Sequence, residues 1–321
     1  MIKHFLSLKD YTREEILDIL KLSIEIKNSF LNGQKIIPNF KDKILAMIFE
    51  KSSTRTRISF EAGAYQLGGS SIFLSSKDIQ LGRGESIKDT ARVISSMVDM
   101  IMIRTFEQKR IEEFAEYSSV PVINALSDEF HPTQLIADYL TMIENGISMD
   151  ISANYSQHKI VRKPIVCYIG DGNNMANSWL FLASKLGFEL RIATPKGFEP
   201  ISEFVNIATK ETNAKINITN NPKEAINNAN VVTTDTWVSM GQEEDKNIKI
   251  KAFKGFCVNN DLMRLASKNA IFLHCLPAYR GYEVSDDVIE GSQSKVFQEA
   301  QNRLHAQKGI MSFLGEKNWK K

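Results

Sequence analysis

The sequence is poor in cysteine, and its three cysteines lie far apart in the chain. Cys167, Cys257 and Cys275 are too few and too scattered to form a disulfide framework. Two of them lie in apolar, strand-like runs, which is typical of packed thiols. Because disulfides mark oxidising compartments and the pattern predicts none, we expect a protein of the reducing cytoplasm.

Long apolar runs and an excess of one charge are also missing. No run approaches the roughly 18 residues of a membrane span, and the N-terminal stretch MIKHFLSLKDYTREE lacks the apolar core of a signal peptide. The 40 Lys and Arg residues nearly balance the 38 Asp and Glu residues. Nucleic-acid binding usually leaves a basic stripe, and no stripe is longer than Lys320-Lys321 or Arg162-Lys163. We therefore expect neither a membrane nor a nucleic acid as a partner.

Short apolar runs alternate with helical patterns along the whole chain, which predicts an α/β protein with parallel sheets. A chain of 321 residues exceeds the usual size of a single core, and a polar, irregular stretch follows Gly146. We expect two domains of similar size, 1–147 and 148–321, each with a central parallel sheet flanked by helices. The predicted strands are 43–50, 71–75, 100–104, 120–125, 165–169, 190–194, 216–219, 231–235, 255–258 and 271–276.

Ligands of parallel sheets bind beyond the carboxyl ends of the strands, so residues just past each strand are candidates for the chemistry. The first such stretch holds Ser53, Thr54, Arg55 and Thr56 at a predicted helix start. Free N–H groups, hydroxyls and a guanidinium together suit a phosphate. The GxxxxGK[ST] cradle of nucleoside triphosphatases is absent. A capped helix with solvated arginines is the alternative.

Two further strand ends carry buried-type polar residues. Arg104 directly follows four apolar residues in MIMIR and suits a second anion ligand. In FHPTQ, His131 precedes a helix start and Gln134 lies one turn later on the same face. A neutral imidazole and a primary amide suit a small carbonyl or amide group. Local capping by His131 is the alternative.

The stretch IGDGNNMANS resembles a dinucleotide-binding fingerprint only in part. Gly170 and Gly172 follow a strand and precede a helix, but Met175 replaces the third glycine. The next strand ends without the acidic residue that binds a ribose hydroxyl. An NAD-dependent oxidoreductase is therefore a weak alternative.

The last two strand ends suggest an amino-acid site. In DTWVSMG, the carboxylate of Asp235 and the hydroxyl of Ser239 suit an ammonium group, while N–H groups of the turn suit a carboxylate; loop capping by Asp235 is the alternative. His274 and Cys275 should point to opposite faces of the strand, so they do not form a nucleophile pair. No CxxC or second spaced histidine indicates a metal site. Cys275 is either functional or simply packed.

Taken together, SSTRTR, FHPTQ, GDGNN, DTWVSMG and HCLP resemble, in order and spacing, the aspartate/ornithine carbamoyltransferase superfamily over essentially the whole chain. SMG and HCLP are typical of its ornithine branch. The resemblance implies a last helix at about 298–315 that returns to the N-terminal domain. It implies no metal and no organic cofactor.

The resemblance also implies roles for individual residues. Cys275, Arg104 and His131 would be catalytic, with Cys275 accepting the proton of the attacking amine after a positive field has lowered its pKa. Gln80 would complete the site of a neighbouring subunit, which implies a homotrimer as the minimal unit. The carbamoyl phosphate ligands would be Ser53, Thr54, Arg55, Thr56, Gln80, Arg104, His131, Gln134, Cys275, Leu276 and Arg303. The ornithine ligands would be Asn174, Asp235, Ser239 and Met240.

The implied reaction transfers the carbamoyl group of carbamoyl phosphate to the δ-amine of L-ornithine, giving L-citrulline and phosphate. A carbamoyltransferase that uses another acceptor, such as putrescine or aspartate, is the nearest alternative. A catalytically silent binding protein is a further one. The physiological direction, arginine synthesis or arginine degradation, stays open from the sequence.

Overall fold

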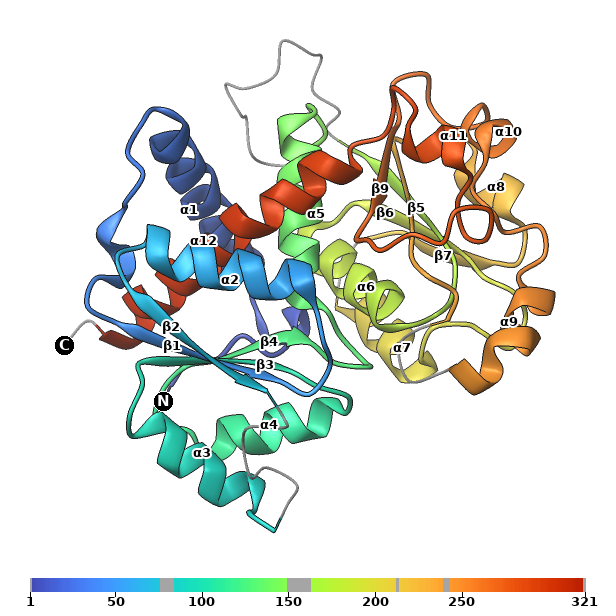
Figure 1. Ribbon diagram of the computed structural model, residues 1–321. Coiled ribbons are helices and arrows are strands. Elements are labelled where there is room, and N and C mark those ends of the chain that lie inside the picture. Colours follow the sequence, from blue (N-terminus) through green and yellow to red (C-terminus); the bar gives the residue numbers. More distant parts are fainter. Residues whose placement is uncertain (1, 76–83, 149–162, 212–213, 239–242, 320–321) are drawn as a thin grey trace. The chain divides into compact units, whose positions relative to one another are not determined.

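The computed structural model describes residues 2–75, 84–148, 163–211, 214–238 and 243–319 (Figure 1). The chain forms two compact units: unit 1 comprises Met1–Ala137 and Gln301–Lys321, and unit 2 comprises Asp138–Ala300. The division falls inside helices α5 (Pro132–Glu144) and α12 (Val296–Trp319). A domain boundary at 147/148 stays a prediction. None of the described helices is both long and apolar enough to cross a membrane.

Unit 1 is built on a parallel sheet with the strand order β2-β1-β3-β4. Helices α1, α2 and α12 cover one face, and α3 and α4 cover the other (Figure 1). Phe49 pairs with both Ser75 and Arg104, so three strands end together at one edge. The elements are β1 (Ile44–Phe49), β2 (Ser70–Ser75), β3 (Met100–Arg104), β4 (Val122–Leu126), α1 (Arg13–Leu31), α2 (Thr54–Gln66), α3 (Ile87–Ser95) and α4 (Gln108–Tyr117), with short 3-10 helices at Leu8–Asp10 and Pro38–Phe40.

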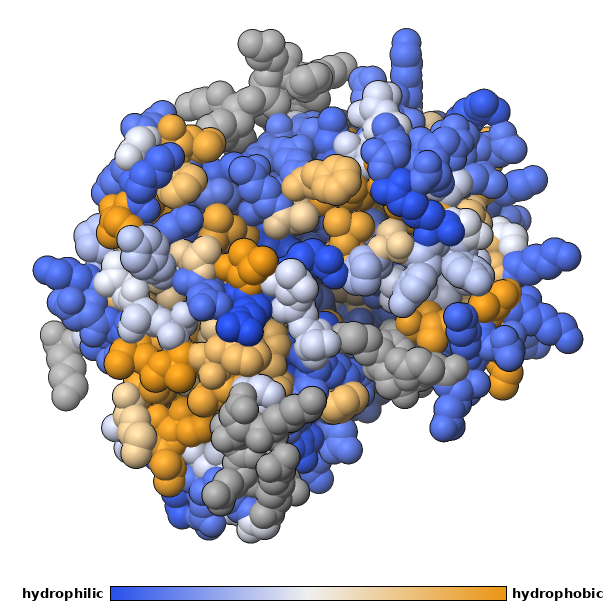
Figure 2. Space-filling model, viewed as in Figure 1, coloured by the Kyte–Doolittle hydropathy of each residue, from blue (hydrophilic) through white to orange (hydrophobic). Residues whose placement is uncertain are grey.

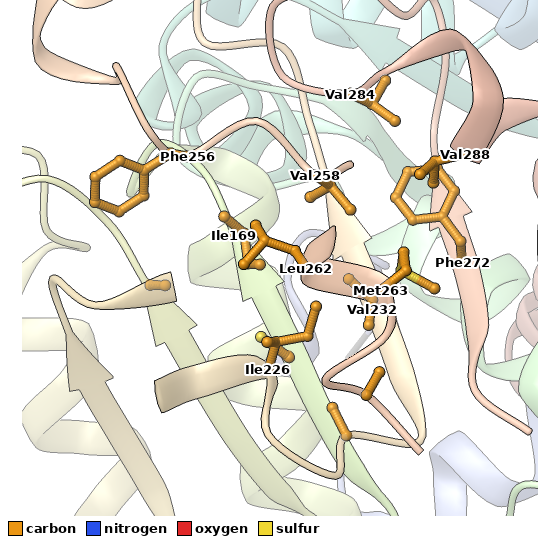
Figure 3. Close-up of a cluster of buried hydrophobic side chains, with 14 of the residues drawn as sticks. Ile169, Ile226, Val232, Phe256, Val258, Leu262, Met263, Phe272, Val284 and Val288 are labelled. Carbon is orange, nitrogen blue, oxygen red and sulfur yellow. The ribbon is translucent and has the colours of Figure 1, made fainter. Parts of the chain in front are cut away.

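Unit 2 is built on a second parallel sheet with the strand order β7-β6-β5-β8-β9. Between this sheet and α8 and α10 lies an apolar cluster that includes Ile226, Val232, Leu262 and Phe272 (Figure 3). The elements are β5 (Ile165–Ile169), β6 (Glu189–Ala193), β7 (Ile216–Thr219), β8 (Val231–Thr234), β9 (Ile271–His274), α6 (Asn174–Leu186), α7 (Ser202–Lys210), α8 (Pro222–Ile226), α9 (Lys246–Ala252), α10 (Asn260–Met263) and α11 (Asp286–Ile289), with a 3-10 helix at Glu243–Asp245.

The predicted fold class, two parallel sheets flanked by helices, is confirmed. The strand predicted at 255–258 is wrong. Gly255 has a left-handed backbone (φ +96°), and of residues 255–258, all of them described, only Val258 forms a bridge, with Val284. Phe256 and Val258 are apolar because they pack into the core of unit 2, without strand pairing.

The C-terminal helix packs on unit 1, as predicted, and is longer than predicted. Gly309 of α12 lies so close to Ile19 and Ser23 of α1 that an added Cβ would clash with both. Gly63 of α2 faces Met311 of α12 less tightly, since an added Cβ would lie 3.2 Å from the methionine Cε. Two close glycine contacts thus hold α12 against α1 and α2, and this packing fixes where Arg303 points.

The buried histidine of α12 makes the stability of unit 1 sensitive to acid. Burial, with the ammonium groups of Lys308 and Lys27 nearby, lowers the pKa of His305 from 6.5 to about 3. Below pH 6.5, His305 therefore binds a proton in the unfolded chain but stays neutral in the folded chain. The free energy of unfolding consequently falls as the pH decreases from 6.5 towards 3.

We expect His305→Gln to reduce this acid sensitivity. One such histidine costs about 1 kcal/mol of unfolding free energy between about pH 7.5 and 5.5. Urea denaturation of the wild type and the variant at both pH values measures the difference. If the free energy of unfolding falls equally in the two proteins between these pH values, His305 is not the group responsible.

Candidate active site

The N-terminus of α2 lies directly after β1, and one hydroxyl there is used for capping. Ser53 Oγ accepts a hydrogen bond from Thr56 N (3.2 Å) and donates one to Thr56 Oγ1 (3.0 Å). Thr54 is exposed, and Arg55 Nε has no hydrogen-bond partner among the described residues. Capping therefore accounts for Ser53 and leaves Thr54 and Arg55 available to a ligand.

Helix α12 brings a second arginine to this helix start. Arg303 Nη2 donates a 2.7 Å hydrogen bond to Thr56 Oγ1, and both residues are buried. No feature of the local sequence around Arg303 predicts this position, and only the family resemblance pointed to it. The structure thus joins two of the predicted phosphate ligands that are far apart in the chain.

A neutral histidine lies close to two arginines in unit 1. Burial, followed by the positive charges of Arg303 and Arg104, lowers the pKa of His131 well below its usual value. Thr133 Oγ1 lies 3.4 Å from its Nδ1 atom, and Gln134 is buried one turn into the helix. The imidazole is therefore uncharged at neutral pH, beside guanidinium groups that favour an anion.

In unit 2, the ends of β8 and β9 bring a carboxylate and a thiol together. Cys275 Sγ donates to Asp235 Oδ1 (3.2 Å), and Asn173 Nδ2 donates to Asp235 Oδ2 (3.1 Å). Asn173 Oδ1 also caps α6 by accepting from Met175 N (2.9 Å). Both carboxylate oxygens are thus held, and Asp235 is fixed next to Cys275.

The surroundings of this thiol correct one expectation. Cys275 keeps some exposed surface, yet burial of the thiol group is the largest cause that raises its pKa well above the usual value. The negative charges of Asp235 and Glu299 raise it further. The predicted lowering of this pKa is therefore wrong for the surroundings that unit 2 provides, and the thiol is protonated at neutral pH.

A chain of hydrogen bonds shapes the turn after Cys275. Leu276 has a left-handed backbone (φ +57°) and precedes a cis proline. Leu276 N donates to His274 Nδ1 (2.9 Å), so the ring proton is assigned to Nε2, which faces Glu283 Oε1 at 3.3 Å. Glu299 Oε2 accepts from the backbone N–H of His274 (2.8 Å).

The same contacts bear on metal binding. Ligand atoms of Asp235, His274 and Cys275 lie within 4.8 Å of one another. Both ring nitrogens of His274 are already engaged, however, so the trio does not offer three free ligands. The expectation of no metal stays a prediction.

Local packing explains why glycine is needed at position 172 of the partial dinucleotide fingerprint. A side chain at Gly172 would collide with backbone atoms of Glu199 and Pro200. Asn174 is buried at the first position of α6, and Asp171 forms an ion pair with Lys249 (2.5 Å). The glycine therefore serves local packing, which removes the main signal for a nucleotide.

Some predicted residues lie outside the described part of the chain, and some contributing residues were not predicted. Gln80, Ser239 and Met240 belong to the first group. Sequence reasoning missed Glu283 and Glu299. Glu299 lies one helical turn before Arg303, which was an available signal, whereas no motif marks Glu283.

Comparisons with known proteins cover nearly the whole chain. The family model described as "Aspartate/ornithine carbamoyltransferase, carbamoyl-P binding domain" matches residues 3–144, and its "Asp/Orn binding domain" matches residues 163–314. The ornithine carbamoyltransferase of Helicobacter hepaticus is 63% identical over 323 residues, covering 99% of this chain and 98% of the relative. That of Wolinella succinogenes is 59% identical over 319 residues, with 98% and 99% covered.

Solved structures are similar in fold to this chain over nearly its whole length. The anabolic ornithine carbamoyltransferase of Campylobacter jejuni has a TM-score of 0.88 and 46% identity, covering 98% of this chain and 100% of that one. The ornithine carbamoyltransferase of Pyrococcus furiosus has a TM-score of 0.89 and 42% identity, with 97% and 96% covered.

Proposed function

Because this chain belongs to the aspartate/ornithine carbamoyltransferase family, we propose that it transfers the carbamoyl group of carbamoyl phosphate to the δ-amine of L-ornithine. The products are L-citrulline and phosphate. The observation that carries the proposal is the set of buried basic groups in unit 1, where Arg104 and Arg303 flank a neutral His131. This set suits an anion that also carries a carbonyl.

Unit 1 binds carbamoyl phosphate in this proposal. The N-terminus of α2, with Thr54, Arg55 and Thr56, binds the phosphate through N–H groups, hydroxyls and a guanidinium fork. Arg104 and Arg303 add positive charge that stabilises the oxygens as the bond to phosphate breaks. The neutral imidazole of His131 and the amide of Gln134 bind the carbamoyl oxygen and amino group.

Unit 2 binds ornithine. Asp235 accepts from the α-ammonium group, together with Ser239, and Asn174 and Met240 bind the α-carboxylate. The support for Asp235 is its fixed orientation, since Asn173 and Cys275 each donate to one of its oxygens. A putrescine acceptor lacks the carboxylate, and an aspartate acceptor lacks the δ-amine.

The reaction needs a neutral δ-amine, whose free pKa resembles that of lysine, about 10.4. Its nitrogen attacks the carbonyl carbon, a C–N bond forms, and the C–O bond to phosphate breaks. The released proton passes to the Cys275–Asp235 pair, which together holds one proton and one negative charge. The protonated thiol alone would be a poor base, because its S–H group already donates to the carboxylate.

A panel of acceptors tests the assignment. Citrulline or other carbamoylated products are measured with ornithine, lysine, putrescine and aspartate under the same conditions. We expect kcat/KM for ornithine to exceed the others by at least about 100-fold, since buried polar groups left unpaired reject poorly matched substrates. Comparable or faster carbamoylation of putrescine or aspartate would contradict the ornithine assignment.

The proposal includes a homotrimer in the cytoplasm. Exposed large apolar side chains of unit 1 support assembly: Ile58 of α2, Ile72 of the edge strand β2, and Val93 and Met97 at α3 and just after it. Figure 2 shows hydrophobic surface gathered over this part of unit 1. Such a surface is typical of protein contacts, and Gln80 lies in the segment that follows β2.

A charge on this surface should separate the subunits. We expect Ile58→Glu to shift the sedimenting species from three chains to one and to lower activity, because Gln80 completes a neighbouring site. Leu31→Glu is the matched control, since Leu31 at the end of α1 is equally exposed (60% against 61%). Dissociation by Leu31→Glu, or a persistent trimer in Ile58→Glu, would place the interface elsewhere.

A further inference from the structure

Asn173, in the stretch GDGNN, has no role assigned in binding either substrate, yet it joins two features of unit 2. Its Oδ1 atom accepts from Met175 N (2.9 Å) and Ala176 N (3.4 Å) and so caps helix α6. Its Nδ2 atom donates to Asp235 Oδ2 (3.1 Å), just after β8. One half-buried amide therefore links the first turn of α6 to the carboxylate of the proposed ornithine site.

Hydrogen bonds determine which way this amide faces. Two backbone N–H groups of α6 donate to Oδ1. The hydroxyl of Tyr168 also lies 3.2 Å from this oxygen and shares its proton between it and the carbonyl oxygen of Asp171 (2.9 Å). The opposite orientation would set the NH2 group of Asn173 against these donors and turn its oxygen towards the carboxylate of Asp235. The start of α6 thus dictates that a donor faces Asp235.

The carboxylate of Asp235 is oriented by one donor on each oxygen. Cys275 Sγ donates to Oδ1 (3.2 Å), and Asn173 Nδ2 donates to Oδ2 (3.1 Å). A carboxylate offers about four acceptor positions, so these two bonds fix its plane and leave capacity for an ammonium group. Without the amide of Asn173, Oδ2 loses this donor and the carboxylate is no longer held in the same orientation.

We propose that Asn173 is a positioning residue of the ornithine site, which transmits the position of the α6 N-terminus to Asp235 and so sets the affinity for the α-ammonium group. The inference rests on the proposed function for the identity of the ligand. A helix cap without this role is the alternative. The two roles reside in different atoms, Oδ1 for the cap and Nδ2 for Asp235, so a substitution can remove one and keep the other.

The variant Asn173→Ser separates the two roles. Serine caps a helix about as well as asparagine, but its side chain ends one bond sooner and has no NH2 group for Asp235. We therefore expect its Tm to stay within about 3 °C of the wild-type value. L-norvaline, which is ornithine without the δ-amino group, reports binding of the α-amino acid part without turnover. Calorimetry with carbamoyl phosphate present should show its Kd raised at least about tenfold in the variant.

The matched control is Asn221→Ser, the same substitution at the N-cap of α8. The side chain of Asn221 accepts from Lys223 N (3.1 Å), as a cap does, and lies outside the proposed site. We expect this control to bind norvaline as the wild type does.

A double-variant cycle shows whether Asn173 acts through Asp235. In the otherwise wild-type enzyme, Asn173→Ser should lower kcat/KM for ornithine at least about tenfold and leave the KM for carbamoyl phosphate little changed. When Asp235→Ala has already removed the carboxylate, the same substitution should change kcat/KM by less than about threefold.

The outcomes separate this inference from the proposed function. Wild-type affinity for norvaline in Asn173→Ser, at an unchanged Tm, would reduce Asn173 to a helix cap and overturn the inference. Equal losses in both backgrounds of the cycle would also overturn it, because Asn173 would then act independently of Asp235. An enzyme that is inactive towards ornithine but binds norvaline in the expected pattern would refute the proposed function and leave the role of Asn173 standing.

Discussion

Replacing Arg55 with methionine should lower kcat/KM for carbamoyl phosphate by about 100- to 1,000-fold. Arg55 lies in the first turn of α2, and its Nε atom has no hydrogen-bond partner among the described residues, so its guanidinium is available to the phosphate. Methionine keeps the unbranched apolar part of the side chain and lacks the guanidinium. The loss should therefore reflect the missing charge and donors.

Arg13→Met is the matched control for this variant. Arg13 also lies in the first turn of a helix, at the start of α1, but it is outside the proposed site. We expect the control to keep kcat/KM within about twofold, as is typical of substitutions away from functional features. Calorimetric binding of carbamoyl phosphate without ornithine gives the direct measurement. Undiminished binding by Arg55→Met would remove this residue from the phosphate site.

Asp235→Asn should reduce kcat by about 100- to 10,000-fold, the range of general acid–base catalysis. It should also raise the KM for ornithine, because the α-ammonium group loses its carboxylate. The KM for carbamoyl phosphate should change little. Asparagine keeps the shape and one oxygen that can still accept from Asn173, while its NH2 group replaces the oxygen that accepts from Cys275, so the variant removes the negative charge together with that one acceptor.

Cys275→Ala tests whether the proton acceptor is the Cys275–Asp235 pair or the thiolate of Cys275 alone. If the pair holds the negative charge, alanine leaves the carboxylate of Asp235 in place and should cost at least about tenfold less in kcat than Asp235→Asn. Thermal unfolding of both variants checks that each is folded. A larger loss in Cys275→Ala than in Asp235→Asn would make the thiolate the base.

The strand ends could be predicted from the sequence because each carries a sharp change from apolar to polar residues. Arg104 at the end of MIMIR and Asp235 after a buried strand illustrate this, and the structure puts both at the carboxyl edge of their sheets. The strand predicted at 255–258 is wrong because this prediction used only the apolar character of the residues. Its apolar residues are buried by packing, and burial alone does not distinguish a strand from a loop.

Contacts between distant segments could not be predicted from local pattern. The bond from Arg303 to Thr56 depends on the way α12 packs on α1 and α2 through Gly309 and Gly63. The direction of the Cys275 pKa shift likewise depends on burial of the thiol and then on the negative charges of Asp235 and Glu299, which belong to other elements. A sequence identifies a thiol, but its burial and the carboxylates around it decide its charge.

The most direct test of the central claim follows the transferred carbon. Carbamoyl phosphate labelled with ¹³C is incubated with the enzyme and ornithine labelled with ¹⁵N at the δ-position, and the product is analysed by NMR. Transfer to the δ-amine predicts a ureido ¹³C signal split by the attached ¹⁵N, with one phosphate released per citrulline. An unsplit carbon signal, from carbamoylation of the α-amine or from hydrolysis alone, would contradict the proposed reaction.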